Sequence, residues 1–545
     1  MPQRRSHVAP SAAQTELAAA LSGLRVNLDA PVEFPTAVLA EAEQATASQP
    51  ELDLRDIAFA TLDPEGSRDL DQAFHLERDG DGYTVRYAIA DVPSFVAPGG
   101  AVDAEARRRG QTLYAADGTI PLHPTVLSED RASLLPGVDR PAFVWTFSLD
   151  SAGAVTTFRL ERALIRSREQ LDYVSAQESL DRGEDGPVTL LPVIGALRIE
   201  QEKSRGGASL NLPDEEVVRA PDGAYAIERR QPLPVEDWNA QLSLMTGMAA
   251  ASLMLDAKIG VLRTMPQPDE KSFDAFRHQT AALGRPWTTG RYGDYLRELD
   301  RADPLTLPIL EAAASLFRGA GYVVFDGTAP ADAMQAAIGA PYAHTTAPLR
   351  RLVDRWSLTI CLAISRGEDI PDWVRESLNE LPALMQESAQ RASKLDSATI
   401  NCVEAALLRP FVGTTIDATV IAVRDDRATV QIAEPAVTAS APVPAGTAAG
   451  SVVRLSVRSV DIAEGKIELV PSPGGIATCS PPGRQNSSVD GFSSQSSSTT
   501  CRGASSTPPC CMCVPGAPIS SSKPAAPATI IWVVRSTRTK EPLHP

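Results

Sequence analysis

Three aspartates lie close together in the segment TLDPEGSRDLDQA, residues 61–73. Asp63 follows the apolar run IAFATL, which should form a strand, and Asp69 and Asp71 are two residues apart. On an extended segment these two side chains face the same way, and Leu70 between them turns into the core. Carboxylates without His or Cys suit a hard cation such as Mg²⁺ or Mn²⁺. Two ions about 3.5–4 Å apart would clamp the attacking and leaving oxygens of a phosphodiester.

Other structures fit the same spacing. A solvated acidic turn explains it as well as a metal loop does, because Pro64 and Gly66 allow a tight turn. A calcium loop of the EF-hand type is a weaker explanation, since D-x5-D-x-D does not match its ligand spacing and no glutamate closes the loop. Spacing alone therefore leaves a metal site and a solvated turn as equal alternatives.

A second candidate site lies far downstream, in YAHTTAPLRRLVDR. Thr345 or Thr346 can cap a helix whose first turn would contain Arg350 and Arg351. Exposed helix amides and a guanidinium fork together suit a phosphate. A helix start with solvated arginines is the alternative. His344 could contact a phosphate or base, or make a structural hydrogen bond.

Length and charge restrict the function classes. A chain of 545 residues is too long for one ordinary domain, so a large core with at least one smaller module is expected. The formal net charge of −17 makes the surface repel nucleic acid overall, so such a partner requires a local basic groove or bound cations. No signal peptide or membrane span is apparent. We therefore expect a monomeric, cytoplasmic protein without membrane association.

Composition and periodicity divide the chain into four parts. Residues 1–50 are rich in Ala and Glu and should be helical, and residues 51–408 mix strands and helices as an α+β domain. Residues 409–470 alternate as short strands and predict a small β-barrel. Residues 471–545 are rich in Ser, Pro, Gly and Thr, which predicts a disordered tail.

Individual elements can be predicted within the α+β domain. GYTVRYAIADV alternates as a half-buried strand does. DAEARRRG predicts a short helix that Asp103 caps and Gly110 ends. VEDWNAQLSLMTGMAAASLMLDA and APLRRLVDRWSLTICLAISRG predict two long helices. Cys361 and Cys402 should be buried free thiols. The other cysteines lie in the tail, where a CCMC cluster lacks the second pair that a zinc site needs.

The motifs of the central block occur in a specific order. TLDPEGSRDLDQAFHL is followed by YAIADVPSFVAPGGAVDAEARRRGQTLYAADGTIPLHPTVLSED, ALIRSREQLDY, RGGASLNLPDEEV, the helix from Val235, and HTTAPLRRLVD. Together they resemble the catalytic domain of the ribonuclease II family, also called the RNB family, over about residues 51–408. The resemblance implies a mixed sheet with surrounding helices, followed by a shortened S1-like barrel of the oligonucleotide-binding type.

The resemblance implies a metal-dependent, hydrolytic 3′→5′ exoribonuclease. Such an enzyme releases nucleoside 5′-monophosphates from single-stranded RNA at a Mg²⁺ site, with Mn²⁺ as an alternative ion. By motif position, Asp63, Asp69 and Asp71 match the metal-site aspartates of the family. Gln72 stands where the family usually has a fourth aspartate, so it is the fourth predicted metal-site residue.

Further site residues follow from the same motifs. Arg350 matches the arginine that holds the scissile phosphate, and with Asp69 and Asp71 it would carry the catalysis. Tyr114 and Tyr173 match the two aromatic residues that hold the 3′ end of the RNA. Both suit base stacking, which is tolerant of sequence.

The chain also departs from the family pattern. Fifty residues before the catalytic domain are too few for the paired cold-shock barrels of the family. Gln241 stands where many members have Glu, and Asp396 is near the place of a family glutamate. The RNA groove would rely on arginines, namely Arg107, Arg108, Arg109, Arg166, Arg168, Arg350 and Arg351. Most of them could equally be surface arginines, because only Arg350 belongs to a family motif.

Three functions remain open on the sequence. The first is an active exoribonuclease. The second is a catalytically impaired RNB-fold protein that binds RNA or a partner, because Gln72 carries no charge where the family has a carboxylate. The third is a metal-dependent hydrolase of another phosphate ester that reuses the fold.

Overall fold

The structure is a computed structural model of the chain. It describes residues 4–7, 12–28, 30, 32–116, 118–208, 214–219, 225–300, 306–314, 316–424, 426–435 and 437–477. The predicted tail beyond residue 477, including its cysteines, lies outside these residues. Within the described part of the chain, no helix is both long and apolar enough to cross a membrane.

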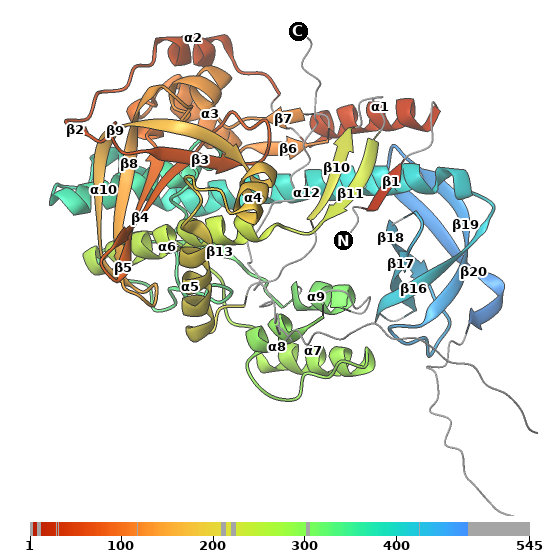
Figure 1. The fold of residues 1–545 in the computed structure, drawn as a ribbon. Coiled ribbons are helices and arrows are strands. Elements are labelled where there is room, and N and C mark those ends of the chain that lie inside the picture. The colour runs from red at the N-terminus through yellow and green to blue at the C-terminus, as the bar shows by residue number, and fades with distance from the viewer. Residues whose placement is uncertain are drawn as a thin grey trace, which may run out of the picture. The chain divides into compact units, whose positions relative to one another are not determined.

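A six-stranded mixed sheet forms the centre of the α+β domain (Figure 1). Its strands, in the order of pairing, are β2 (Leu52–Asp53), β9 (Val155–Asp172), β3 (Phe59–Asp63), β4 (Gln72–Asp79), β5 (Gly82–Ala90) and β8 (Asp139–Leu149). The long strand β9 pairs antiparallel with β8 and, in its last residues, parallel with β3. Strands β3, β4, β5, β8 and β9 therefore form a closed ring of hydrogen-bonded neighbours.

Strand β5 is buried on both faces. Tyr83, Val85 and Tyr87 pack in one hydrophobic cluster, and Ala88 and Ala90 pack in a second one. The prediction of a half-buried strand was wrong. The reason is that helices and loops cover both sides of this sheet, so the face expected to meet solvent is also inside the protein.

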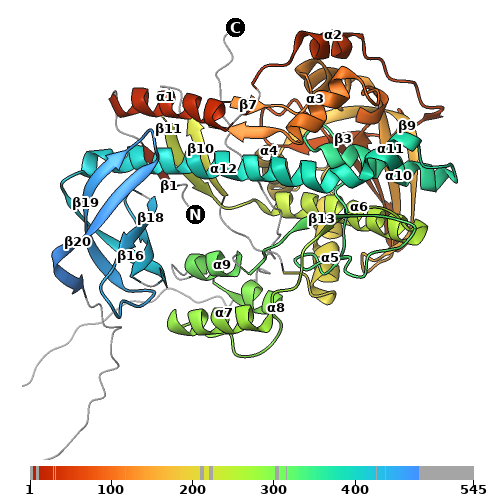
Figure 2. The same ribbon diagram turned by 180° about the vertical axis from the view of Figure 1, so that it is seen from behind.

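Helices cover the sheet and connect it to the rest of the chain. They are α3 (Ala101–Arg109), α4 (Tyr173–Arg182), α5 (Leu191–Ser204), α6 (Pro234–Ala257), α10 (Leu352–Arg366), α11 (Asp372–Ser377) and α12 (Leu381–Leu408). Helices α6 and α10 are the two long helices predicted from the sequence. Figure 2 shows α12 as the long helix that links the α3 and α10 region to the C-terminal barrel.

Helix α3 begins earlier than predicted. Asp103 lies inside its first turn, where it accepts the Gly99 N–H, so Asp103 is not the cap. Instead, the Glu41 carboxylate accepts the N–H groups of Ala101 and Val102, at 2.6 and 3.2 Å. A residue 60 positions away in sequence satisfies these free amides, which local pattern could not reveal. Gly110 ends the helix as predicted, with φ +72°.

The remaining elements are shorter. The first 50 residues contain β1 (Arg4–His7), α1 (Ala12–Asn27) and α2 (Thr36–Gln44), and β1 pairs with the hairpin of β10 (Asp214–Arg219) and β11 (Tyr225–Arg230). The other pairs are β6 (Leu113–Ala115) with β7 (Gly118–Ile120), β12 (Ile259–Thr264) with β13 (Gly321–Asp326), and β14 (Met334–Gln335) with β15 (Ala340–Pro341). Between β12 and β13 lie α7 (Glu270–Ala282), α8 (Tyr292–Glu298) and α9 (Thr306–Ala314). Short turns of other helix types occupy Val92–Ser94, Leu127–Arg131, Leu378–Glu380 and Arg409–Phe411.

A five-stranded antiparallel sheet follows α12 and forms the predicted small barrel. Its order is β18 (Val437–Pro442), β17 (Arg427–Ile432), β16 (Thr415–Arg424), β19 (Val452–Asp461) and β20 (Lys466–Ala477). Strand β20 continues past the predicted boundary at residue 470. The last turns of α12 share a hydrophobic cluster with this sheet. Cys361 and Cys402 are buried free thiols, as predicted.

A buried ion pair joins α3 to α10. The Arg355 guanidinium donates hydrogen bonds to the Asp103 carboxylate and, at 2.9 Å, to the Val96 carbonyl. Both charged side chains are 2% exposed. Arg107 also contacts Asp103, at 3.2 Å. A buried carboxylate that loses its partner is strongly destabilising.

We expect Arg355→Met to destabilise the protein by about 3 kcal/mol, because Asp103 would stay buried with Arg107 as its remaining cation. The measurement is the thermal unfolding midpoint. Arg454→Met is the matched control, since Arg454 pairs with Asp417 on the exposed surface and should change little. Equal shifts in the two variants would contradict this assignment.

A buried histidine lies beside the same ion pair. His123 is 2% exposed and is hydrogen-bonded to the Pro348 carbonyl, while its Nδ1 atom has no hydrogen-bond partner among the described residues. Burial lowers the pKa of His123 to about 4, and the Arg355 charge acts in the same direction. The folded protein therefore keeps this imidazole neutral at pH values where the unfolded chain takes up a proton.

Stability should consequently fall between pH 6.5 and about 4, because only the unfolded state binds the proton there. From pH 7 to pH 5 this contributes roughly 2 kcal/mol of lost stability. Urea unfolding of the native protein and of His123→Gln at both pH values isolates the contribution. A parallel decline in the two proteins would show that His123 is not the group responsible.

Candidate functional site

The acidic loop connects β3 to β4 at one end of the sheet. Asp63 is the last residue of β3 and pairs with Asp172, the last residue of β9. Leu70 is fully buried, as predicted, and its N–H donates to the Ser133 hydroxyl at 3.0 Å. Because the Leu70 side chain is buried and its N–H is hydrogen-bonded, Asp69 and Asp71 on either side of it are held beside the core.

Asp71 is buried and makes the key contact of the loop. Its carboxylate accepts the Leu349 N–H at 2.7 Å and lies 3.6 Å from Nε of Arg350. Burial raises the pKa of Asp71 well above its usual range, the nearby Asp69 adds to the shift, and Arg350 and the Leu349 N–H oppose it. Burial therefore disfavours the charged form of this carboxylate, and a cation bound beside it would stabilise that form.

Gln72 is the first residue of β4, directly after Asp71. Its side-chain amide donates a hydrogen bond to the Thr346 carbonyl. The Thr346 hydroxyl also lies 2.8 Å from the Ser243 hydroxyl on α6. The predicted fourth metal-site residue thus contacts the backbone of the segment that carries Arg350.

The segment around Arg350 differs from its prediction. Helix α10 begins at Leu352, and its N-cap, Arg351, has extended backbone with no side-chain cap. Thr345 and Thr346 therefore do not cap this helix, and Arg350 precedes it. The reason is a pairing with the chain after α3, in which the Thr112 N–H donates to the Arg350 carbonyl at 3.0 Å.

Most of the arginines predicted to line an RNA groove are engaged elsewhere. Six of the seven contact acidic side chains or backbone carbonyls outside the acidic loop: Arg107 with Asp103 and Glu380, Arg108 and Arg109 with Glu105, Arg166 with Asp139, Arg168 with the Arg55 carbonyl, and Arg351 with Asp354. These contacts favour the alternative of surface arginines for the six, because each has a nearby acceptor. The Arg350 side chain is 44% exposed.

Both predicted aromatic residues lie near the acidic loop or the arginine. Tyr114 on β6 interacts electrostatically with Arg350. Tyr173 begins α4 and is hydrogen-bonded to the Asn239 side chain. Burial raises the pKa of Tyr173, and the Asp63 carboxylate adds to the shift. The structure thus brings one tyrosine to Arg350 and the other to Asp63.

Two residues near the site were not found from the sequence. Arg263 and Tyr322 are cross-strand partners on β12 and β13, with the guanidinium 4.7 Å from the ring centre. The Tyr322 hydroxyl lies 2.7 Å from Nδ1 of His344, which shows a structural hydrogen bond of the kind considered for this histidine. The two strands lie 57 or more residues apart in sequence, and only their short apolar runs offer a signal.

The remaining departures also have a place in the structure. Gln241 on α6 is fully buried and donates to the Glu202 carboxylate at 2.9 Å. A glutamate at position 241 would set two buried carboxylates against each other, which explains the amide. Asp396 lies half-buried on α12, next to Leu395, which shares a hydrophobic cluster with Leu113 beside Tyr114.

The donor set suits a hard cation only in part. In the described part of the chain, no group of three or more His, Cys, Asp or Glu side chains is arranged to hold a metal ion. Asp69 and Asp71 interact electrostatically, and Asp63 and Asp71 both act on the buried phenol of Tyr87. The three aspartates therefore share one neighbourhood, and the buried Asp71 supplies the charge that a divalent ion would offset.

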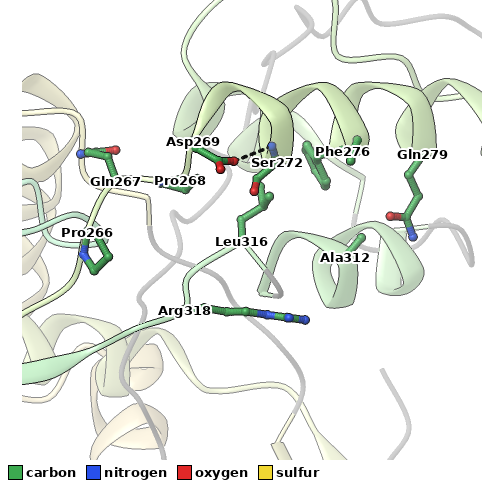
Figure 3. Close-up of a pocket in the computed structure, with 11 residues that line it drawn as sticks. Pro266, Gln267, Pro268, Asp269, Ser272, Phe276, Gln279, Ala312, Leu316 and Arg318 are labelled. Atoms are coloured by element: carbon green, nitrogen blue, oxygen red, sulfur yellow. Dashed lines mark hydrogen bonds between the residues drawn. The ribbon is translucent and has the colours of Figure 1, made fainter.

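A cavity of about 410 Å³ lies away from these residues (Figure 3). It is formed by α7, α9 and the loop before α7, with Phe276, Gln279 and Arg318 on its walls. Asp269 lies at its edge and accepts the Ser272 N–H at 2.8 Å as the N-cap of α7. None of the predicted site residues lines this cavity.

Comparison with known proteins gives the fold a family. The RNB domain family model matches residues 51–360, and the model for an RNase II-type exonuclease C-terminal S1 domain matches residues 414–472. Ribonuclease R of Escherichia coli (strain K12) is 28% identical over 345 residues, 59% of this chain and 41% of that enzyme. The chain thus spans less than two thirds of the length of this relative.

Solved structures agree in fold. Mycoplasma genitalium RNase R in complex with ribose methylated single-stranded RNA superimposes with a TM-score of 0.76 at 18% identity, covering 84% of this chain and 78% of that one. Yeast Ssd1, a pseudonuclease, has a TM-score of 0.61 at 15% identity, covering 78% and 54%. The family model for the catalytic domain covers more than half of the 545 residues, and the protein therefore belongs to the RNB family.

Proposed function

We propose that the protein is a metal-dependent 3′→5′ exoribonuclease that hydrolyses single-stranded RNA to nucleoside 5′-monophosphates. The RNB exoribonucleases depend in general on divalent metal ions. The observation that carries the proposal is the meeting of Asp71 with Leu349 and Arg350. It sets a carboxylate of the predicted metal site beside the guanidinium of Arg350, which is 44% exposed. We expect the enzyme to act as a monomer in the cytoplasm.

The residues divide the chemistry between them. Asp63, Asp69 and Asp71 would hold Mg²⁺, with Mn²⁺ as an alternative, and the bound ion supplies an activated water and offsets phosphate charge. Arg350 donates hydrogen bonds to the scissile phosphate and stabilises the charge that develops on it. Tyr114 and Tyr173 stack on bases near the 3′ end, which requires no particular sequence.

One observation favours a second function, an RNB-fold protein that binds RNA without cleaving it. Gln72 is neutral where the family has an aspartate, and a pseudonuclease shares the fold. The motif aspartates, both tyrosines and Arg350 all remain, however, and their proximity supports activity. The two functions differ in one measurable property, the shortening of RNA from its 3′ end.

The test is incubation of the full chain with a 5′-labelled single-stranded RNA and Mg²⁺ or Mn²⁺. We expect a descending ladder and nucleoside 5′-monophosphate products. Asp71→Asn should lower the rate by about 10²–10⁴-fold, because it removes the charge at the metal site. An asparagine oxygen can still accept the Leu349 N–H, so the local structure should persist.

Asp417→Asn is the matched control, since Asp417 is exposed on β16 and pairs with Arg454. It should cleave as the native protein does. RNA binding with no shortening in any metal would favour the binding-only function. Shortening that continues in EDTA would contradict a metal-dependent mechanism.

Stacking on Tyr114 can be tested by binding alone, in the Asp71→Asn background where the RNA stays intact. Tyr114→Ala should weaken RNA affinity roughly 5- to 150-fold, because one stacked base contributes roughly 1–3 kcal/mol. Tyr114→Phe keeps the ring and should retain the affinity. Fluorescence anisotropy measures both, and an equal loss in the two variants would argue against stacking.

A further inference from the structure

Two consecutive residues hold the turn before Arg350 at two points. Asp71 accepts the Leu349 N–H at 2.7 Å, and the Gln72 amide donates to the Thr346 carbonyl. Asp71 uses an acceptor and Gln72 uses a donor, so each matches the backbone group that it meets. The turn lies between these two contacts, and Arg350 is the residue that follows the second contact at Leu349.

The contact at position 72 depends on a donor. Thr346 is 2% exposed, and its carbonyl faces the Gln72 amide nitrogen. An aspartate there would be one methylene shorter and, when ionised, could only accept hydrogen bonds. It would set a carboxylate against a buried carbonyl, and such an unmatched contact is costly.

We propose that Gln72 is a positioning residue that holds the Arg350 turn through Thr346, and not the fourth ligand of the metal ion. This inference rests on the proposed function, because it gives Gln72 a task at the same site. It replaces the role that the sequence resemblance implied for Gln72. The metal would then be held by the three aspartates alone, and the neutral Gln72 would position Arg350.

Other contacts of the turn support this assignment. Asp354 accepts the Ala347 N–H at 2.7 Å and pairs with Arg351, so the neighbouring backbone and the second arginine have their own partner. The Thr346 hydroxyl meets Ser243 at 2.8 Å, while its carbonyl meets Gln72. Loss of the Gln72 donor should therefore loosen the turn at the Thr346 carbonyl and leave its other contacts in place.

The first arm of the test measures metal binding without catalysis. The full chain and its Gln72→Met variant are titrated with Mn²⁺, and free Mn²⁺ is followed by electron paramagnetic resonance. Methionine has a similar length but offers neither the amide donor nor the carboxamide oxygen. We expect the Mn²⁺ affinity to change less than about 3-fold, whereas loss even of a residue that orients a metal ligand typically costs about 10-fold or more. A loss of that size would overturn the proposal.

The second arm measures coupling to Arg350 through RNA affinity, in the Asp71→Asn background. Gln72→Met and Arg350→Gln are made singly and together. If Gln72 acts through Arg350, Gln72→Met weakens binding alone but adds less than about 2-fold to Arg350→Gln. Independent, additive losses, or no loss from Gln72→Met alone, would overturn the proposal. Neither of these first two arms requires cleavage. If the native protein does not cleave RNA, the exoribonuclease proposal is rejected, but both arms still test the role of Gln72.

The third arm uses activity and the charge of the side chain. Gln72→Glu restores a carboxylate and has the same length, but it cannot donate to Thr346 when ionised. We expect its kcat to fall about 10- to 100-fold with Gln72→Met, as misplacement of a catalytic group does. A gain of activity in Gln72→Glu would instead mark position 72 as a weakened ligand.

Gln201→Met is the matched control for all three arms. Gln201 also donates its amide to a backbone carbonyl, that of Ala152 at 3.0 Å, but it lies on α5 away from the site. It should leave Mn²⁺ affinity, RNA affinity and kcat unchanged. Thermal unfolding of each variant confirms that it is folded, and if Gln72→Met is not, Gln72→Leu, which also lacks a donor and a ligand oxygen, serves in the first two arms.

Discussion

The buried carboxylate of Asp71 accepts the Leu349 N–H and faces Arg350, across 278 positions of sequence. A charge taken out of water is costly unless it is paired and hydrogen-bonded. The loop after β3 and the turn before α10 therefore depend on each other: the turn supplies the donors, and the loop supplies the acceptor. The closed ring of strands and the buried Leu70 hold the loop side of this contact. The Asp103–Arg355 pair, which joins α3 to α10, helps to hold the turn side.

The distribution of charge bears on the proposed binding of RNA. The protein is acidic overall, and arginines that look available in the sequence are neutralised by nearby carboxylates or bound to carbonyls. Arg350 lies beside the Asp71 carboxylate, whose charged form is disfavoured by burial. Long-range electrostatic steering of the proposed RNA substrate should be weak as a result. Its affinity should come from base stacking and from contacts at the site itself.

Two glutamines stand where a carboxylate would be expected from the family, and both have a local physical reason. Gln241 donates to Glu202 in a fully buried setting, and Gln72 donates to the Thr346 carbonyl. In each case the partner is an acceptor, so a carboxylate would leave two acceptors facing each other. A glutamine in place of a family carboxylate can therefore reflect a hydrogen bond that needs a donor, and not a loss of function.

The sequence by itself determined many of the elements and the motifs that carry the candidate site residues. The periodicity of β5, α6 and α10, the small barrel, the buried Leu70 and the end of α3 at Gly110 all follow from local pattern. The beginning of α10, the cap of α3, the burial of both faces of β5 and the partners of six arginines did not. These features depend on groups such as Glu41 and Thr112 that lie far away along the chain. Only the tertiary structure decides which distant donor meets which acceptor, because propensity and spacing act locally, whereas burial forces every polar group to find a partner.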